Sequence, residues 1–271
     1  MVNIARINFS NRVMPASGTL AYTDAYSPYI NFSKLGAIVT KAVTFDPRAG
    51  NPPPRLMETE KGIINHVGLQ NKGVKYFLEK ELTLLTSHAV PIIVNIAGST
   101  EEEYLNIVKL LSPYSQQISG IEVNVSCPNV KEGCLAFGES PSIINKLVSS
   151  LRKATEIPLI IKLTPNAKDI VGVAQSAVDA GADALTLINT VKVEENGFKG
   201  GLSGPAIRPL ALRLIEKVKK VISIPVIGVG GICCKDDVVS FLSAGATCVQ
   251  IGTAAMIRPW LLEKLGLQFR E

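Results

Sequence analysis

The phrase Asp179-Ala180-Gly181-Ala182 recurs, with one substitution, as Ser243-Ala244-Gly245-Ala246. In both copies a glycine directly follows a helical stretch, a position where glycine commonly ends a helix. A short apolar run then begins at once, Ala184–Ile188 after the first copy and Cys248–Ile251 after the second. The phrase therefore predicts a helix, a tight turn and a buried strand in succession, which is the repeating unit of an α/β fold.

Similar apolar runs occur along the rest of the chain. They are four or five residues long and continuous rather than alternating, which is typical of parallel strands covered on both faces. The expected strands are Val13–Ala16, Ala37–Lys41, Ile92–Ile96, Gly120–Asn124, Leu159–Leu163, Ala184–Ile188, Val226–Val229 and Cys248–Ile251. The expected helices are Val74–Ser87, Glu101–Leu111, Ser142–Thr155, Asp169–Ala180, Ile207–Val221 and Asp236–Ala244. This alternation predicts a (β/α)8 TIM barrel, and 271 residues suit one such domain spanning residues 1–271.

Composition and charge indicate which kinds of partner and which compartment to expect. The net charge is +5 and is spread along the chain, without the clustered basic stripe that nucleic-acid binding needs. The five cysteines are odd in number and form no C-x-x-C motif, which favours a reducing compartment. The N-terminus lacks an apolar signal region, and the apolar runs are too short for a membrane helix. We therefore expect a cytoplasmic protein that binds small molecules, not nucleic acid or membranes.

Polar residues gather at the carboxyl ends of the expected strands, where barrel active sites lie. Four amides are notable, three of them beside expected strand ends: Asn65, Asn124, Asn129 and Asn189. One such residue alone would more often be a turn residue. Together they favour a planar ligand with carbonyl and N–H edges, such as a pyrimidine, because amides both donate and accept.

The last two expected strands end in Gly230-Gly231 and Gly252-Thr253. Each pair precedes a helix, and barrels commonly bind phosphate with backbone N–H groups at these two ends. The alternative is that the glycines only make tight turns. Two such turns on these two strands predict a phosphate site.

Lys162 is a lysine within an otherwise apolar strand, and a buried lysine needs a partner or an anion. No acidic partner lies nearby in sequence, so we expect its ammonium to lie beside a flavin, where a cation would stabilise the anionic reduced ring. A salt bridge inside the barrel is the alternative. Lys41 ends another strand in the same way and either contributes a cation to the site or extends to solvent.

Cys127 follows the fourth expected strand, in a loop among polar neighbours. Since His66 and His88 are the only histidines, a thiolate at this position is a natural candidate for a catalytic base. A free cysteine is more often a small core residue. We apply that interpretation to Cys233, Cys234 and Cys248.

The segment Asn124-Val125-Ser126-Cys127-Pro128-Asn129 resembles the active-site loop of class 1 dihydroorotate dehydrogenases, whereas class 2 enzymes carry serine in place of this cysteine. The resemblance runs nearly end to end. It includes Ala16-Ser17-Gly18, Thr40-Lys41, Gly50-Asn51-Pro52-Pro53-Pro54-Arg55, Asn65-His66-Val67-Gly68-Leu69-Gln70-Asn71, Ile161-Lys162-Leu163-Thr164-Pro165-Asn166, Gly200-Gly201-Leu202-Ser203-Gly204-Pro205-Ala206 and Gly228-Val229-Gly230-Gly231-Ile232.

The resemblance implies oxidation of dihydroorotate to orotate in de novo pyrimidine (UMP) biosynthesis, with FMN as cofactor and no metal in this chain. Cys127 would remove the C5 proton while C6 delivers hydride to FMN. The residues implied to bind FMN are Ala16, Ser17, Gly18, Lys41, Asn95, Asn124, Lys162, Gly204, Gly230, Gly231, Gly252 and Thr253. Those implied to bind substrate are Lys41, Asn65, Gly68, Leu69, Asn124, Asn129, Asn189 and Thr190.

Within class 1, Val130-Lys131-Glu132-Gly133, the triple proline and Leu202-Ser203-Gly204-Pro205 resemble the B type. This implies a partner subunit that carries FAD and [2Fe–2S] and passes electrons to NAD, in a heterotetramer built on a homodimer of catalytic chains. The sequence itself has no cluster-binding cysteine pattern and no G-x-G-x-x-G. Two departures from the B type are a shorter stretch between Asn189 and Gly200 and a short C-terminus after Trp260.

Three alternatives remain at this point. One is an A-type homodimer that uses fumarate and needs no partner. Another is a dihydropyrimidine dehydrogenase-like reductase on the same barrel, although Asn129 after Pro128 favours orotate. The third is a barrel without catalytic activity that only binds a phosphorylated ligand.

Overall fold

The computed structural model describes residues 2–20, 23–125 and 134–270. Its centre is a parallel sheet of eight strands in the order β3-β14-β13-β10-β9-β8-β7-β4. The strands are β3 Val13–Pro15, β4 Ile38–Val39, β7 Ile92–Ile96, β8 Gly120–Asn124, β9 Leu159–Lys162, β10 Ala184–Leu187, β13 Val226–Val229 and β14 Cys248–Ile251. The two end strands, β3 and β4, contact each other, and Gly36 N donates to Val13 O at 2.8 Å where they meet. The sheet therefore curves into a barrel, and each predicted strand is confirmed.

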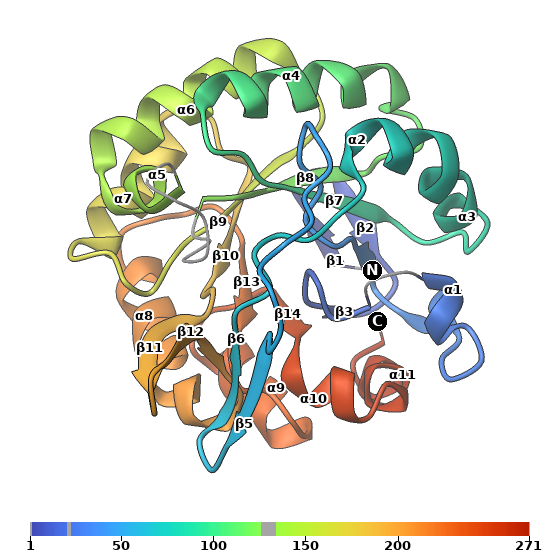
Figure 1. Cartoon of the computed structure of the whole chain (residues 1–271), viewed down its shortest axis with the longest axis vertical. Helices are drawn as coiled ribbons and strands as arrows, with labels where there is room; N and C mark the ends of the chain where they lie inside the picture. Colours follow the sequence, from blue (N-terminus) through green and yellow to red (C-terminus); the bar gives the residue numbers. More distant parts are fainter. Residues whose placement is uncertain (1, 21–22, 126–133, 271) are drawn as a thin grey trace.

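The helices surround the strands (Figure 1). They are α1 Thr23–Tyr26, α2 Gly73–Tyr76, α3 Leu82–Thr86, α4 Glu101–Leu111, α5 Cys134–Glu139, α6 Pro141–Ala154, α7 Ile170–Asp179, α8 Arg208–Lys219, α9 Lys235–Ser243, α10 Thr253–Ile257 and α11 Trp260–Gln268. Short turns of helix add η1 Phe32–Lys34, η3 Ser112–Tyr114 and η4 Pro205–Ile207. The expected helix Val74–Ser87 contains a π-helical segment, η2 Phe77–Glu81, between α2 and α3. None of the helices in these described ranges is both long and apolar enough to span a membrane.

Side chains inside the barrel form layers, because alternate residues of a strand point to the same side. The lowest layer is apolar. A hairpin of β1 Val2–Ile4 and β2 Ile7–Phe9 packs against it and covers the amino ends of the strands. The barrel residues of this cluster are Met14, Ala37, Val39, Ile93, Ile160, Ala184, Ile227 and Cys248.

Two residues further along the same strands, the next layer is polar. Its members are Asn95, Glu122, Lys162, Thr186 and Gln250, all buried. The layer above them opens into a cavity, so the polar layer forms a floor between the apolar core and the carboxyl ends of the strands.

A second sheet of four antiparallel strands lies outside the barrel, in the order β11-β12-β6-β5. It joins β5 Leu56–Thr59 and β6 Gly62–Asn65 to β11 Val191–Glu195 and β12 Phe198–Ser203. The polar segment Thr44–Lys72, which is rich in proline and glycine, follows β4 and predicts a long loop that carries function. In the structure that segment contributes a hairpin whose β6 pairs with β12, with Asn65 opposite Gly201.

Candidate active site

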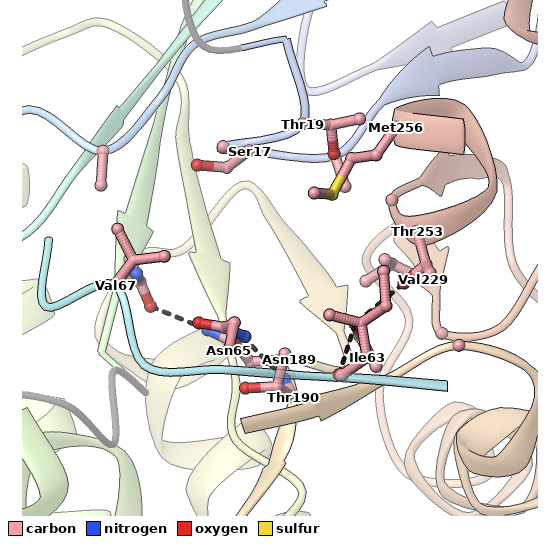
Figure 2. A pocket seen from close by; sticks show the side chains of 18 of the residues that line it. Ser17, Thr19, Ile63, Asn65, Val67, Asn189, Thr190, Val229, Thr253 and Met256 are labelled. Carbon is pink, nitrogen blue, oxygen red and sulfur yellow. Dashed lines mark hydrogen bonds between the residues drawn. The ribbon is translucent and has the colours of Figure 1, made fainter. Parts of the chain in front are cut away.

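The carboxyl ends of the barrel strands surround a cavity of about 260 Å³. Figure 2 shows Ser17 and Thr19, which follow β3, across the cavity from Asn65, Asn189 and Thr190. Two other hollows in the described chain are larger, about 470 and 490 Å³, but they lie elsewhere. One is formed around Ser27–Phe32, and the other opens beside the β1–β2 hairpin. Position at the strand ends, not volume, identifies the candidate site.

Most of the site residues predicted from the sequence line this cavity. The described ones that line it are Ala16, Ser17, Gly18, Lys41, Asn65, Gly68, Leu69, Asn124, Lys162, Asn189, Thr190, Gly204, Gly230, Gly231, Gly252 and Thr253. Cys127 and Asn129 lie outside the described residues, as does Val130-Lys131-Glu132-Gly133.

Asn95 is not brought to the cavity wall. It is buried in the polar layer, where its Nδ2 donates to Glu122 Oε1 at 2.7 Å. Asn95 precedes the last residue of β7, Ile96, and shares its layer with Glu122, below the residues that end the strands. Its amide oxygen has no hydrogen-bond partner among the described residues.

Several apolar wall residues of the cavity were not predicted from the sequence. They are Ala42, Leu56, Ile63, Val67, Ile188, Ile207, Val229 and Met256, together with the hydroxyl residues Thr19 and Ser203. Ile63 and Val67 come from β6 and the residues after it, so the unpredicted β5–β6 hairpin supplies them. They give a site rich in polar anchors an apolar surface suited to a flat ring.

Four glycines form a cradle on one side of the cavity. Gly204, Gly230 and Gly231 have positive φ angles of 110°, 134° and 77°, which suit glycine alone. A Cβ on Gly231 would lie 2.7 Å from Gly204 O, whereas one on Gly252 would meet nothing nearer than Ala16 Cβ at 3.6 Å. The backbone is thus tightly packed on one side and open toward the cavity, as a phosphate-binding cradle requires.

The amide groups of the opposite wall are held in place by hydrogen bonds. Asn189 Nδ2 donates to Asn124 Oδ1 at 3.1 Å, and Asn65 Nδ2 donates to Gly201 O at 3.0 Å. Tyr104, fully buried on α4, donates from its hydroxyl to Asn124 O at 2.7 Å and fixes the end of β8. The amides can therefore bind a planar ring without first being ordered.

Lys41 adds positive charge to the wall. Burial of its ammonium lowers the pKa of Lys41, and the neighbouring Arg55 guanidinium lowers it further, whereas the Glu81 carboxylate raises it. An anion in the cavity would counter the first two effects. The site is therefore electrostatically suited to a carboxylate or a phosphate.

Lys162 has an acidic partner that is distant in sequence, so the alternative of a salt bridge inside the barrel is confirmed. Its Nζ lies 3.2 Å from Glu122 Oε1 on the adjacent strand and 3.2 Å from Gln250 Oε1. Lys162 also lines the cavity and is 5% exposed. It is both a salt-bridged lysine and a cation at the cavity floor, so the two interpretations do not exclude each other.

The interpretation of three cysteines as core residues is confirmed only for Cys248, which is fully buried. Cys233 is half-buried and Cys234 is exposed, so the interpretation is wrong for Cys234. These two thiols and Asp237 lie close enough to suggest a metal site. However, Arg208 Nη1 contacts Asp237 Oδ1 at 2.6 Å, and burial raises the pKa of Cys233, so the cluster does not favour a cation.

A family model for dihydroorotate dehydrogenase matches residues 1–267. The chain is also similar to curated proteins named dihydroorotate dehydrogenase B (NAD(+)), catalytic subunit. One from Pelobacter propionicus is 45% identical over 268 residues, which cover 95% of this chain and 88% of the relative. Another from Geobacter metallireducens is 44% identical, covering 100% of this chain and 92% of the relative. A third from Listeria welshimeri is 44% identical, covering 97% and 90%.

Proposed function

This chain belongs to the dihydroorotate dehydrogenase family, and from that premise we propose that it is an FMN-dependent catalytic subunit that oxidises (S)-dihydroorotate to orotate. The observation that carries the proposal is the meeting of three features in one cavity: the glycine cradle, the Lys162 ammonium and the amide cluster. The reaction belongs to de novo pyrimidine (UMP) biosynthesis, and we propose that it takes place in the cytoplasm.

The donor set suits FMN. The cradle glycines Gly230, Gly231 and Gly252, with Thr253, would hold the phosphate with backbone N–H groups, and the apolar wall would pack against the flavin ring. Lys162 would place a cation against the ring. FMN supplies, when bound, the acceptor for the hydride that leaves C6 of dihydroorotate.

Side chains of the chain itself would bind the substrate and remove its proton. Asn65, Asn124 and Asn189 hold the carbonyl and N–H edges of the pyrimidine, and Lys41 binds its carboxylate. Cys127 is proposed as the base that takes the C5 proton, and the electron pair of that C–H bond forms the C5=C6 double bond.

We further propose that electrons leave through a partner subunit carrying FAD and [2Fe–2S] and pass to NAD, in a heterotetramer of two catalytic and two partner chains. The proposal is supported by relatives whose names specify NAD(+) and a catalytic subunit. The same names do not favour the fumarate-dependent alternative.

Anaerobic mixing with dihydroorotate tests the reaction. The purified chain is expected to carry oxidised flavin, and dihydroorotate is expected to bleach its visible absorbance within one turnover. Fumarate should not reoxidise the isolated chain, whereas NAD should accept electrons once the flavin and iron–sulfur partner is added. A chain that holds no flavin, or whose flavin dihydroorotate leaves oxidised, would contradict the proposed reaction.

Replacing Gly231 with alanine should weaken FMN binding about tenfold, since strain at a positive φ and crowding cost about 1–3 kcal/mol. The new Cβ would lie 2.7 Å from Gly204 O in the cradle and 3.1 Å from Cα of the adjacent Pro205. Gly197→Ala is the matched control, because Gly197 has nearly the same φ, 78°, but open space around its Cβ. Fluorescence titration of apoprotein with FMN measures both. Equal affinity in the two variants would count against the cradle.

A further inference from the structure

The polar layer beneath the cavity is centred on one carboxylate, Glu122, which is fully buried on β8. Its Oε1 accepts from Asn95 Nδ2 at 2.7 Å and from Lys162 Nζ at 3.2 Å. Its Oε2 accepts from Gln250 Nε2 at 2.6 Å and from Thr186 Oγ1 at 2.8 Å. Both oxygens therefore have two donors each, supplied by four other barrel strands, and the carboxylate is rigidly held.

Packing alone gives no reason for this arrangement. On the same strands, the layer two residues below is filled with apolar side chains such as Ile93, Ile160 and Cys248. Burying an ion pair is costly, and apolar residues of similar volume often stabilise a core equally well or better. A buried charge at this depth therefore calls for a functional explanation.

Only Lys162 connects the layer with the cavity, among the donors to Glu122. A buried cation at the cavity floor would act strongly on a bound ring, because little solvent screens it there. Glu122 reduces that charge, and together with Gln250 Oε1 at 3.2 Å it also fixes the position of the ammonium. The carboxylate thus acts through Lys162 without itself lining the cavity.

We propose that Glu122 is a positioning residue that sets how strongly the Lys162 ammonium favours the reduced form of a flavin bound above it. The inference rests on the proposed function, because it takes FMN as the bound ring. The reduction potential of that flavin would then depend on the balance of two charges, the Lys162 ammonium at the cavity floor and the Glu122 carboxylate beside it in the polar layer.

Glu122→Gln in the FMN-loaded chain tests the proposal. The substitution keeps the shape and removes the negative charge, so Lys162 should favour reduced flavin more strongly. The equilibrium constant for two-electron reduction, measured by anaerobic titration against a reference dye, should rise about tenfold, which corresponds to a potential about 30 mV higher. Glu216→Gln removes the same charge from an exposed position on α8 and should leave the potential unchanged.

Thr186→Val provides a second measurement with the opposite sign. It removes one donor to Oε2 and keeps every charge, so the carboxylate should counter Lys162 more effectively and lower the reduction equilibrium about threefold. This variant decides the matter if Glu122→Gln fails to fold. The proposal would be overturned by an unchanged potential in both variants, by an unchanged potential in Thr186→Val where Glu122→Gln does not fold, or by a rise in Thr186→Val.

Failure of the proposed function would look different. A wild-type chain that binds no FMN would overturn the function and this inference together. A wild-type chain that binds FMN and is reduced by dihydroorotate, alongside variants with the same potential as wild type, would overturn only the role of Glu122.

Discussion

Cys127→Ala is expected to slow the reduction of bound flavin by dihydroorotate by about 10²- to 10⁴-fold, the range in which a general base contributes. Alanine has no group that can take the C5 proton. Hydride transfer from C6 would therefore have to proceed without removal of the C5 proton. FMN affinity should stay at the wild-type level, since the proposed cofactor contacts come from the cradle, the cavity wall and Lys162. Stopped-flow measurement of flavin absorbance gives the rate directly.

Two further variants of cysteine make the result specific. Cys234→Ala removes an exposed thiol and should reduce flavin at the wild-type rate. Cys127→Ser keeps a proton acceptor, but one that is a far weaker base at neutral pH, so most of the loss in the rate of flavin reduction should remain.

In the wild-type chain, the rate of flavin reduction should rise with pH as the Cys127 thiolate forms, because only the thiolate can accept a proton. A Cys127→Ala chain as fast as wild type would remove this residue from the mechanism.

The strands and the mouth of the barrel could be predicted because both depend on local sequence. A parallel strand covered on both faces is a continuous apolar run, so Ile92–Ile96 and Gly120–Asn124 matched the observed bounds. Once the strands are placed, barrel geometry brings their carboxyl ends together without further information. That is why Asn124 and Asn189, which are 65 positions apart, were expected at one site and are hydrogen-bonded there.

What could not be predicted depends on register or on pairing at long range. Glu122 is 40 positions from Lys162, and nothing local marks it as a partner. The signal was available only after strand alternation was applied, since Glu122 and Asn124 point inward on β8 as Ile160 and Lys162 do on β9. Likewise, β12 includes Gly200 and Gly201 and shows no strand periodicity, so its pairing with β6 was not predicted from the sequence.

The second large effect is expected from removing the charge of Lys162, which is paired with Glu122. Lys162→Met should slow flavin reduction about 10²- to 10³-fold, as loss of one fixed electrostatic group at a reaction centre commonly does. It should also destabilise the fold by about 3–5 kcal/mol, because Glu122 would remain buried without its cationic partner. Stopped-flow reduction and thermal unfolding of the apoprotein measure the two effects separately.

The double variant Lys162→Met/Glu122→Gln separates the structural role of the lysine from its role toward flavin. With both charges gone, no uncompensated carboxylate remains in the barrel, so the unfolding temperature should recover most of the loss. The rate of flavin reduction should stay low, because the cation that favours electron transfer to the ring is still missing. Recovery of both properties would mean that Lys162 serves only to neutralise Glu122, and that the cavity floor acts on the flavin by some other group.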